Sequence, residues 1–73
     1  MKPTEHDFLK FVADILDVSF ESIDMDTCRD EFSQWDSLGH LRLIMEVQEA
    51  YGAQIPLVDF AAIKTFRDLY ERI

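Results

Sequence analysis

Two stretches of this chain repeat apolar residues at helical spacing, and a long segment without any period separates them. In residues 4–17 the apolar side chains recur at i, i+3, i+4, i+7 and i+8, which places them on one helical face, and Thr4 is suited to cap that helix. In residues 37–51 a similar pattern stops at Gly52, where a left-handed residue commonly ends a helix. Because no alternating strand pattern competes, the sequence predicts an all-α fold.

Shorter signals predict the remaining helices. The extended step before Pro56 separates the second helix from the last part of the chain. Asp59 is expected to cap a short third helix that ends near residue 63. Thr65 is expected to cap a last helix that runs to the end of the sequence, with Asp68 completing a weak capping box. The expected architecture is a four-helix bundle of three main helices and one short helix around one core.

Residues 18–36 show no period and form the predicted long loop between the first two helices. A loop of this length is usually functional or held down by its own side chains. A short helical turn is expected around residues 29–32. The side chains expected to pin the loop to the bundle are its scattered apolar residues, Phe20, Ile23, Met25, Phe32 and Trp35.

Size and charge limit the classes of function. A chain of 73 residues makes one small domain, 1–73, with a modest core and little room for a deep catalytic cleft. The net charge is −8, with ten acids against three bases up to residue 36 and five against four afterwards. This imbalance disfavours nucleic acid as a partner. The acids either attract a basic partner protein or simply keep a small domain soluble.

The hydropathy and cysteine content point to a cellular setting. No apolar run approaches the roughly 20 residues needed to cross a bilayer, so we expect no membrane span. The single cysteine, Cys28, argues against a disulfide framework and fits a reducing compartment. We therefore expect a cytoplasmic protein.

Asp36, Ser37 and Leu38 stand where the acidic loop gives way to the second helix. Taken alone, Ser37 reads as an N-cap whose hydroxyl satisfies a backbone N–H group. His40 lies at i+3 from Ser37, so a serine–histidine nucleophile must also be weighed. No predicted strand leads into the serine, as a nucleophile elbow requires, and this argues against a hydrolase.

The acids of the loop raise the question of a metal site. A calcium loop starting at Asp24 would need glycine at its sixth position and glutamate at its twelfth, where this chain has Arg29 and Trp35. Specific metal binding is therefore not expected.

Nearly the whole chain resembles acyl carrier proteins. Residues 35–41 read Trp-Asp-Ser-Leu-Gly-His-Leu, which is similar to the attachment site of that family, and residues 41–52 resemble its second helix. The Ile-Pro step at residues 55–56 resembles the family's transition to the third helix. The resemblance implies an acyl-carrier-like bundle in which Ser37 bears a covalent 4′-phosphopantetheine arm, transferred from coenzyme A by a phosphopantetheinyl transferase that uses Mg²⁺. Asp36 and Leu38 would be the flanking acid and the following leucine of the motif.

The resemblance also implies a stand-alone carrier that performs no catalysis. A monomer is the default expectation for such a shuttle, and the oligomeric state stays open. The thiol of the arm would hold acyl or aminoacyl groups as thioesters and present them to a loading ligase or synthase and to downstream transferases. By this likeness the second helix would touch these partners, with Leu38 partly exposed. The residues expected to take part in docking are His40, Met45, Glu46 and Glu49.

Two residues depart from the fatty-acid carriers. Gly39 and Arg42 stand two and five residues after Ser37, where many fatty-acid carriers have acids. Glycine at the first of these positions also occurs in D-alanyl carrier proteins, so fatty-acyl, polyketide and aminoacyl cargoes all stay open. The six phenylalanines and one tryptophan leave little interior room, which favours a small or aminoacyl cargo. The alternative is a helical interaction module of the same fold that is never modified.

Overall fold

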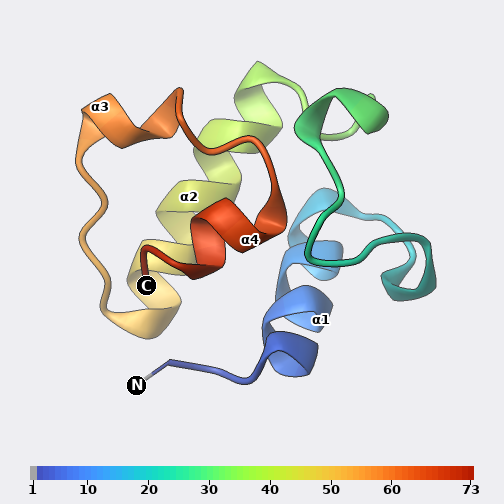
Figure 1. Ribbon diagram of the computed structural model, residues 1–73, viewed down its shortest axis with the longest axis horizontal. Coiled ribbons are helices and arrows are strands. Elements are labelled where there is room, and N and C mark those ends of the chain that lie inside the picture. The colour runs from blue at the N-terminus through green and yellow to red at the C-terminus, as the bar shows by residue number, and fades with distance from the viewer. Residues whose placement is uncertain (1) are drawn as a thin grey trace.

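The computed structural model describes residues 2–73 and shows a helical bundle (Figure 1). Within these residues there is no β-strand, and one isolated antiparallel bridge joins Cys28 to Thr65. The predicted all-α class with four helices is confirmed. In chain order the elements are α1 (Glu5–Leu16), the 3-10 turns η1 (Phe20–Ser22) and η2 (Arg29–Glu31), α2 (Ser37–Tyr51), α3 (Leu57–Phe60) and α4 (Phe66–Tyr70).

The ends of α1 follow from local chemistry, as predicted. Thr4 has extended backbone angles, and its hydroxyl accepts a hydrogen bond from the Asp7 N–H at 3.1 Å. At the other end Asp17 adopts the left-handed conformation with φ 57°, so the helix stops there. Gly52 ends α2 in the same way with φ 64°. These caps explain why the predicted boundaries of the two long helices are correct.

The two later helices correct the sequence-based prediction. The short helix α3 begins at Leu57 with Pro56 as its N-cap, so Asp59 lies inside the helix and does not cap it. Pro56 has the φ of −58° that its ring imposes, and its carbonyl accepts the Asp59 N–H at 2.9 Å, so the helix starts three residues earlier than predicted. The prediction that Asp59 caps this helix was therefore wrong.

The last helix is shorter than expected. Helix α4 ends at Tyr70, and the backbone N–H groups of Arg72 and Ile73 bond to carbonyls three residues back. Such bonds tighten the end of a helix into a 3-10-like turn. The bundle therefore has two long and two short helices rather than three main helices and one short one.

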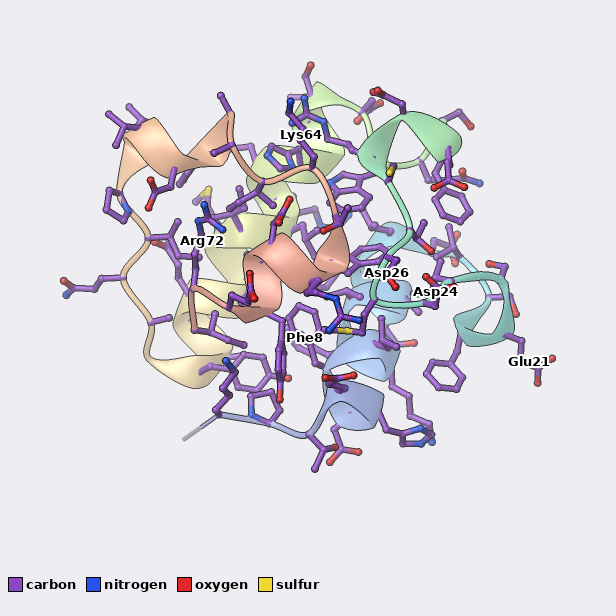
Figure 2. The ribbon with its side chains drawn as sticks, in the orientation of Figure 1. Phe8, Glu21, Asp24, Asp26, Lys64 and Arg72 are labelled. Carbon is purple, nitrogen blue, oxygen red and sulfur yellow. The ribbon has the colours of Figure 1, made fainter. Side chains whose placement is uncertain are left out.

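The core lies where α1 packs against α2 and α4. Figure 2 shows Phe8 directed toward the interior from α1. The indole of Trp35 stacks on the ring of Phe66, with centroids 4.3 Å apart and planes 10° from parallel. The largest fully buried side chains are Trp35, Phe8, Phe66, Leu43, Ile44, Ile63, Leu69, Val12 and Val47.

The long loop is held to α4 by its backbone as well as by side chains. Backbone hydrogen bonds join the Arg29 N–H to the Lys64 carbonyl at 2.7 Å and the Arg67 N–H to the Met25 carbonyl at 2.8 Å. Figure 2 shows Asp26 close to α4, where its carboxylate accepts from Arg67 Nε at 3.0 Å.

The predicted pinning residues of the loop are confirmed in this arrangement, since three are buried and two half-buried. The expected helical turn is also present as η2, whereas the turn η1 was not anticipated. The buried pins are Ile23, Met25 and Trp35, and the half-buried ones are Phe20 and Phe32.

No helix in residues 2–73 is long and apolar enough to span a membrane. The two ends of the described segment are joined by a hydrogen bond from the Tyr70 hydroxyl to the Pro3 carbonyl at 2.6 Å. The last helix therefore closes the bundle against the residues that lead into α1.

The capping box of α4 generates a stability prediction. The Asp68 carboxylate accepts from the backbone N–H groups of Lys64 at 3.0 Å and Thr65 at 3.2 Å, and these bonds, chiefly the one from Lys64, lower the pKa of Asp68 from 3.8. We expect Asp68→Ala to reduce the free energy of unfolding by about 1 kcal/mol at pH 7. Because the folded-state pKa is depressed, this stabilisation is complete above the unfolded pKa and is lost as the pH falls through the folded one.

Urea unfolding of both proteins at pH 7 and in acid measures this difference. Asp14→Ala, which removes an exposed acid from α1, is the matched control and should change the unfolding free energy by less than about 0.5 kcal/mol. An Asp68→Ala effect of the same size at pH 7 and well below pH 3.8 would contradict the assignment.

Candidate functional site

Asp36 is the residue that begins α2. Its backbone is extended, with φ −84° and ψ −170°, and its Oδ1 accepts the Gly39 N–H at 2.8 Å. Its carbonyl accepts the His40 N–H at 2.7 Å, which is the first backbone bond of the helix. Asp36 is therefore the N-cap, and Ser37 is the first helical residue rather than the cap that it resembles in the sequence.

Because Asp36 caps the helix, the hydroxyl of Ser37 is not needed as a cap and is available for reaction. Ser37 is exposed, and within residues 2–73 its Oγ makes no hydrogen bond. The first turn of a helix as long as α2 carries N–H groups without intrahelical partners and a partial positive charge. A phosphodiester formed on Ser37 Oγ would lie beside these groups, so the residues present fit a phosphate-linked group.

Gly39 has a steric reason to be glycine. A β-carbon built on it would lie 2.5 Å from the backbone carbonyl oxygen of Gln34 and 3.2 Å from Asp36 Oδ1. The loop backbone therefore runs directly against the first turn of α2. A side chain at this position, including the acid that fatty-acid carriers often have, would push the loop away from Ser37.

The expectation that His40 takes part in docking needs correction, because the residue is buried. Its side chain is 6% exposed, and both ring nitrogens are engaged. The Trp35 indole N–H donates to Nδ1 at 2.9 Å, and Nε2 lies 2.7 Å from the Phe60 carbonyl oxygen. Since an indole nitrogen only donates and a carbonyl only accepts, the ring is neutral with its proton on Nε2.

The burial of His40 has two chemical consequences. Burial, rather than any charge partner, is the main reason that the pKa of His40 is lowered from 6.5; the Phe60 carbonyl opposes this shift and the charge of Arg29 adds to it. Neither ring nitrogen is free to accept a proton from Ser37. Ser37 and His40 therefore do not form the nucleophile–base pair that a hydrolase needs.

The exposed face of α2 carries the other predicted docking residues. Leu38 is 79% exposed and Met45 is 56% exposed, so neither belongs to the core. They line one shallow groove with Leu41 and Arg42, and the predicted Glu46 and Glu49 lie on the same groove. Arg42 Nε contacts Glu46 Oε2 at 3.0 Å across one helical turn. The groove thus has an apolar floor with charges of both signs along it.

The acids of the loop serve the local backbone. Asp24 Oδ1 accepts the Asp26 N–H at 2.9 Å, and Glu31 Oε2 accepts the Cys28 N–H at 2.6 Å. Among the described residues no group of three His, Cys, Asp or Glu side chains is placed to hold a metal ion.

The sequence did not predict how Trp35 and Gly39 support the segment around Ser37. The sequence predicts Trp35 only as a pin for the loop and gives no indication of its bond to His40. It shows that Gly39 differs from the residue found in many fatty-acid carriers, but it does not show that the Gln34 carbonyl lies close to this position. The available signal was the close spacing of an indole donor and an imidazole acceptor, five residues apart on either side of the helix start.

Comparison with known protein families adds evidence that is independent of this geometry. The sequence model of the family described as "phosphopantetheine attachment site" matches residues 6–73. No curated protein matches the chain.

The contact at Gly39 predicts that alanine destabilises the protein more at this position than at Gly52. Gly39→Ala should lower the free energy of unfolding by about 1–3 kcal/mol, because the new methyl group must displace the Gln34 carbonyl. The control is Gly52→Ala, where no atom lies within 4 Å of the added carbon and only the positive φ of 64° opposes it, at about 1 kcal/mol. Urea unfolding of the two variants measures both effects. A Gly39→Ala variant as stable as the wild type would contradict the close approach of the loop.

Proposed function

This chain belongs to the phosphopantetheine attachment site family, and on that premise we propose that Ser37 is the residue that carries the arm. The family bears a covalently attached 4′-phosphopantetheine group. The observation that supports Ser37 is its free, exposed hydroxyl at the first residue of α2, with the capping done by Asp36.

The residues around Ser37 have separate tasks in this proposal. Asp36 fixes the start of the helix, so that Ser37 Oγ stays open to solvent where a transferase can reach it. The exposed Leu38 offers an apolar contact beside the reacting oxygen. The helix N-terminus then stabilises the negative charge of the phosphodiester. When bound, the arm supplies a thiol that holds an acyl or aminoacyl group as a thioester.

The function of the whole domain is that of a carrier, which performs no chemistry on its cargo. A flexible tether raises the effective concentration of the cargo at each partner enzyme. The partners we propose are a phosphopantetheinyl transferase that uses coenzyme A, a loading ligase or synthase, and downstream transferases, all acting on a cytoplasmic monomer. The groove lined by Leu38, Leu41, Met45, Glu46 and Glu49 is the proposed docking surface.

A small or aminoacyl cargo agrees best with a bundle whose core is filled by its own side chains. The space between the helices is filled by side chains such as Trp35 and Phe66, whose rings are stacked in van der Waals contact. A long acyl chain would have to displace them. We therefore propose that the cargo is carried outside the bundle.

Intact-mass measurement tests the attachment site. The protein is incubated with coenzyme A, Mg²⁺ and a promiscuous phosphopantetheinyl transferase. We expect a gain of one phosphopantetheine, lost completely in Ser37→Ala because the nucleophilic oxygen is absent. Ser33→Ala, which removes another exposed serine hydroxyl four residues earlier, is the matched control and should be modified fully. A folded wild-type protein that gains no mass from an active transferase would favour the unmodified interaction module instead.

Truncation of exposed leucines tests the docking surface. Leu38→Ala should lower kcat/KM for modification by roughly fivefold to thirtyfold, since a central apolar contact is worth about 1–2 kcal/mol. Leu57→Ala is the control, because Leu57 is 77% exposed but lies on α3, outside the groove, and its loss should change kcat/KM by less than about twofold. Equal effects of the two truncations would argue against docking through the groove on α2.

A further inference from the structure

One side chain connects three parts of the molecule around Ser37. His40, in the first turn of α2, is bonded on one side to Trp35 of the loop and on the other to the Phe60 carbonyl of α3. In Figure 1 the start of α2 lies between α3 on one side and η2 of the loop on the other. The His40 ring therefore spans the two segments that border the proposed attachment residue.

The bond from Trp35 fixes the chain immediately before Ser37. Trp35 is 2% exposed and is held in place by its stack on Phe66, so its indole N–H is a rigid donor. Together with the helix, the bond to His40 closes residues 35–40 into a small ring that contains Ser37. The neighbouring Gln34 carbonyl lies so close to Gly39 that the loop has no freedom to shift inward.

The bond to Phe60 fixes α3. This helix has only four residues, and its Leu57 and Val58 are exposed to solvent, so few of its side chains anchor it. Its other polar connection among the described side chains is a contact of 3.8 Å between Asp59 and Arg72. The 2.7 Å bond from His40 Nε2 is therefore the main polar link between α3 and the start of α2.

We propose that His40 is a positioning residue for the modification of Ser37, because it holds the Trp35 segment and α3 in the arrangement that a transferase must recognise. This inference rests on the proposed attachment at Ser37. In the step concerned, Ser37 Oγ bonds to the pantetheine-bearing phosphorus of coenzyme A and its proton passes to the transferase. The phosphoanhydride bond breaks, and adenosine 3′,5′-bisphosphate leaves. His40 touches none of these atoms and acts only through Trp35 and Phe60.

The two bonds respond differently to protonation of the ring. A proton on Nδ1 would face the indole N–H of Trp35, so the bond to Trp35 cannot survive, whereas Nε2 could still donate to Phe60. Arg29, on the loop, is the charged residue that acts on the His40 ring. Its positive charge disfavours a second proton on the ring. On the α3 side the ring meets the uncharged carbonyl of Phe60, and on the far side of Trp35 lies the uncharged ring of Phe66. Acidification should therefore break the bond between Trp35 and His40 before the bond between His40 and Phe60.

Three variants of His40 test the two bonds, and a fourth variant is the control. His40→Leu removes both; His40→Asn retains an acceptor at the Nδ1 position for Trp35, and His40→Gln retains a donor at the Nε2 position for Phe60. His6→Leu, which removes the other, exposed histidine, is the matched control. The readouts are kcat and KM for phosphopantetheine transfer from coenzyme A between pH 5 and 8, and the fluorescence of Trp35, the single tryptophan of the chain.

We expect His40→Leu to lower kcat/KM for transfer by about tenfold to a hundredfold, the size of effect that small displacements of a reacting group produce. His40→Asn should recover most of this loss, and His6→Leu should match the wild type. Because burial lowers the pKa of His40 from 6.5, the wild type should lose transfer rate relative to His40→Asn only toward the acid end of the pH 5 to 8 range. Its Trp35 emission should change in the same range, with no such change in His40→Leu.

The outcomes distinguish this inference from the proposed function. If the wild type is not modified at all, the attachment at Ser37 fails and the positioning role falls with it. If the wild type is modified and His40→Leu is modified at the same rate and with the same pH profile, only the role of His40 is overturned. Should His40→Leu not fold, the Asn and Gln variants decide: equal transfer rates at or near the wild-type value across the pH range would overturn the proposal.

Discussion

The hydrogen bond from Trp35 to His40, with Trp35 stacked on Phe66, is the contact on which the rest of this structure depends. A bundle of this size buries little surface, and the long loop between α1 and α2 contributes no long helix of its own. The loop must therefore be held by single side chains, and Trp35 is the largest that is fully buried. Because Trp35 directly precedes the N-cap Asp36, the same contact that completes the core also holds the end of the loop against the start of α2.

The start of α2 shows how adjacent residues divide structural and chemical tasks. Asp36 satisfies the helix terminus, Gly39 lets the loop pass close by, and His40 ties the loop to α3. Ser37 has none of these duties, so its hydroxyl stays exposed. An attachment residue benefits from such neighbours, since the group it carries must move freely while the helix beneath it stays fixed. The geometry that supports the proposed attachment at Ser37 is thus produced by the neighbouring residues.

The acidic character of the chain is spread unevenly over the structure. Loop acids such as Asp24, Asp26 and Glu31 bond to nearby backbone groups or to Arg67. The groove on α2 instead combines exposed apolar side chains with Arg42 and its partner Glu46. A partner enzyme would therefore meet an apolar contact rimmed by mixed charge on this helix, with most of the negative charge elsewhere acting at longer range.

The sequence by itself determined the elements whose signals are local. Helical periodicity predicts α1 and α2, and Thr4, Gly52 and the pair Thr65 and Asp68 place caps that the structure contains, because a cap depends on atoms within a few residues. The sequence also predicted that Leu38 is at least partly exposed. Only the tertiary structure decided that His40 is buried, that Gly39 meets the loop and that α3 begins at Leu57. These outcomes depend on where the loop backbone and the Phe60 carbonyl arrive in space, and that is set by core packing between residues far apart in the chain.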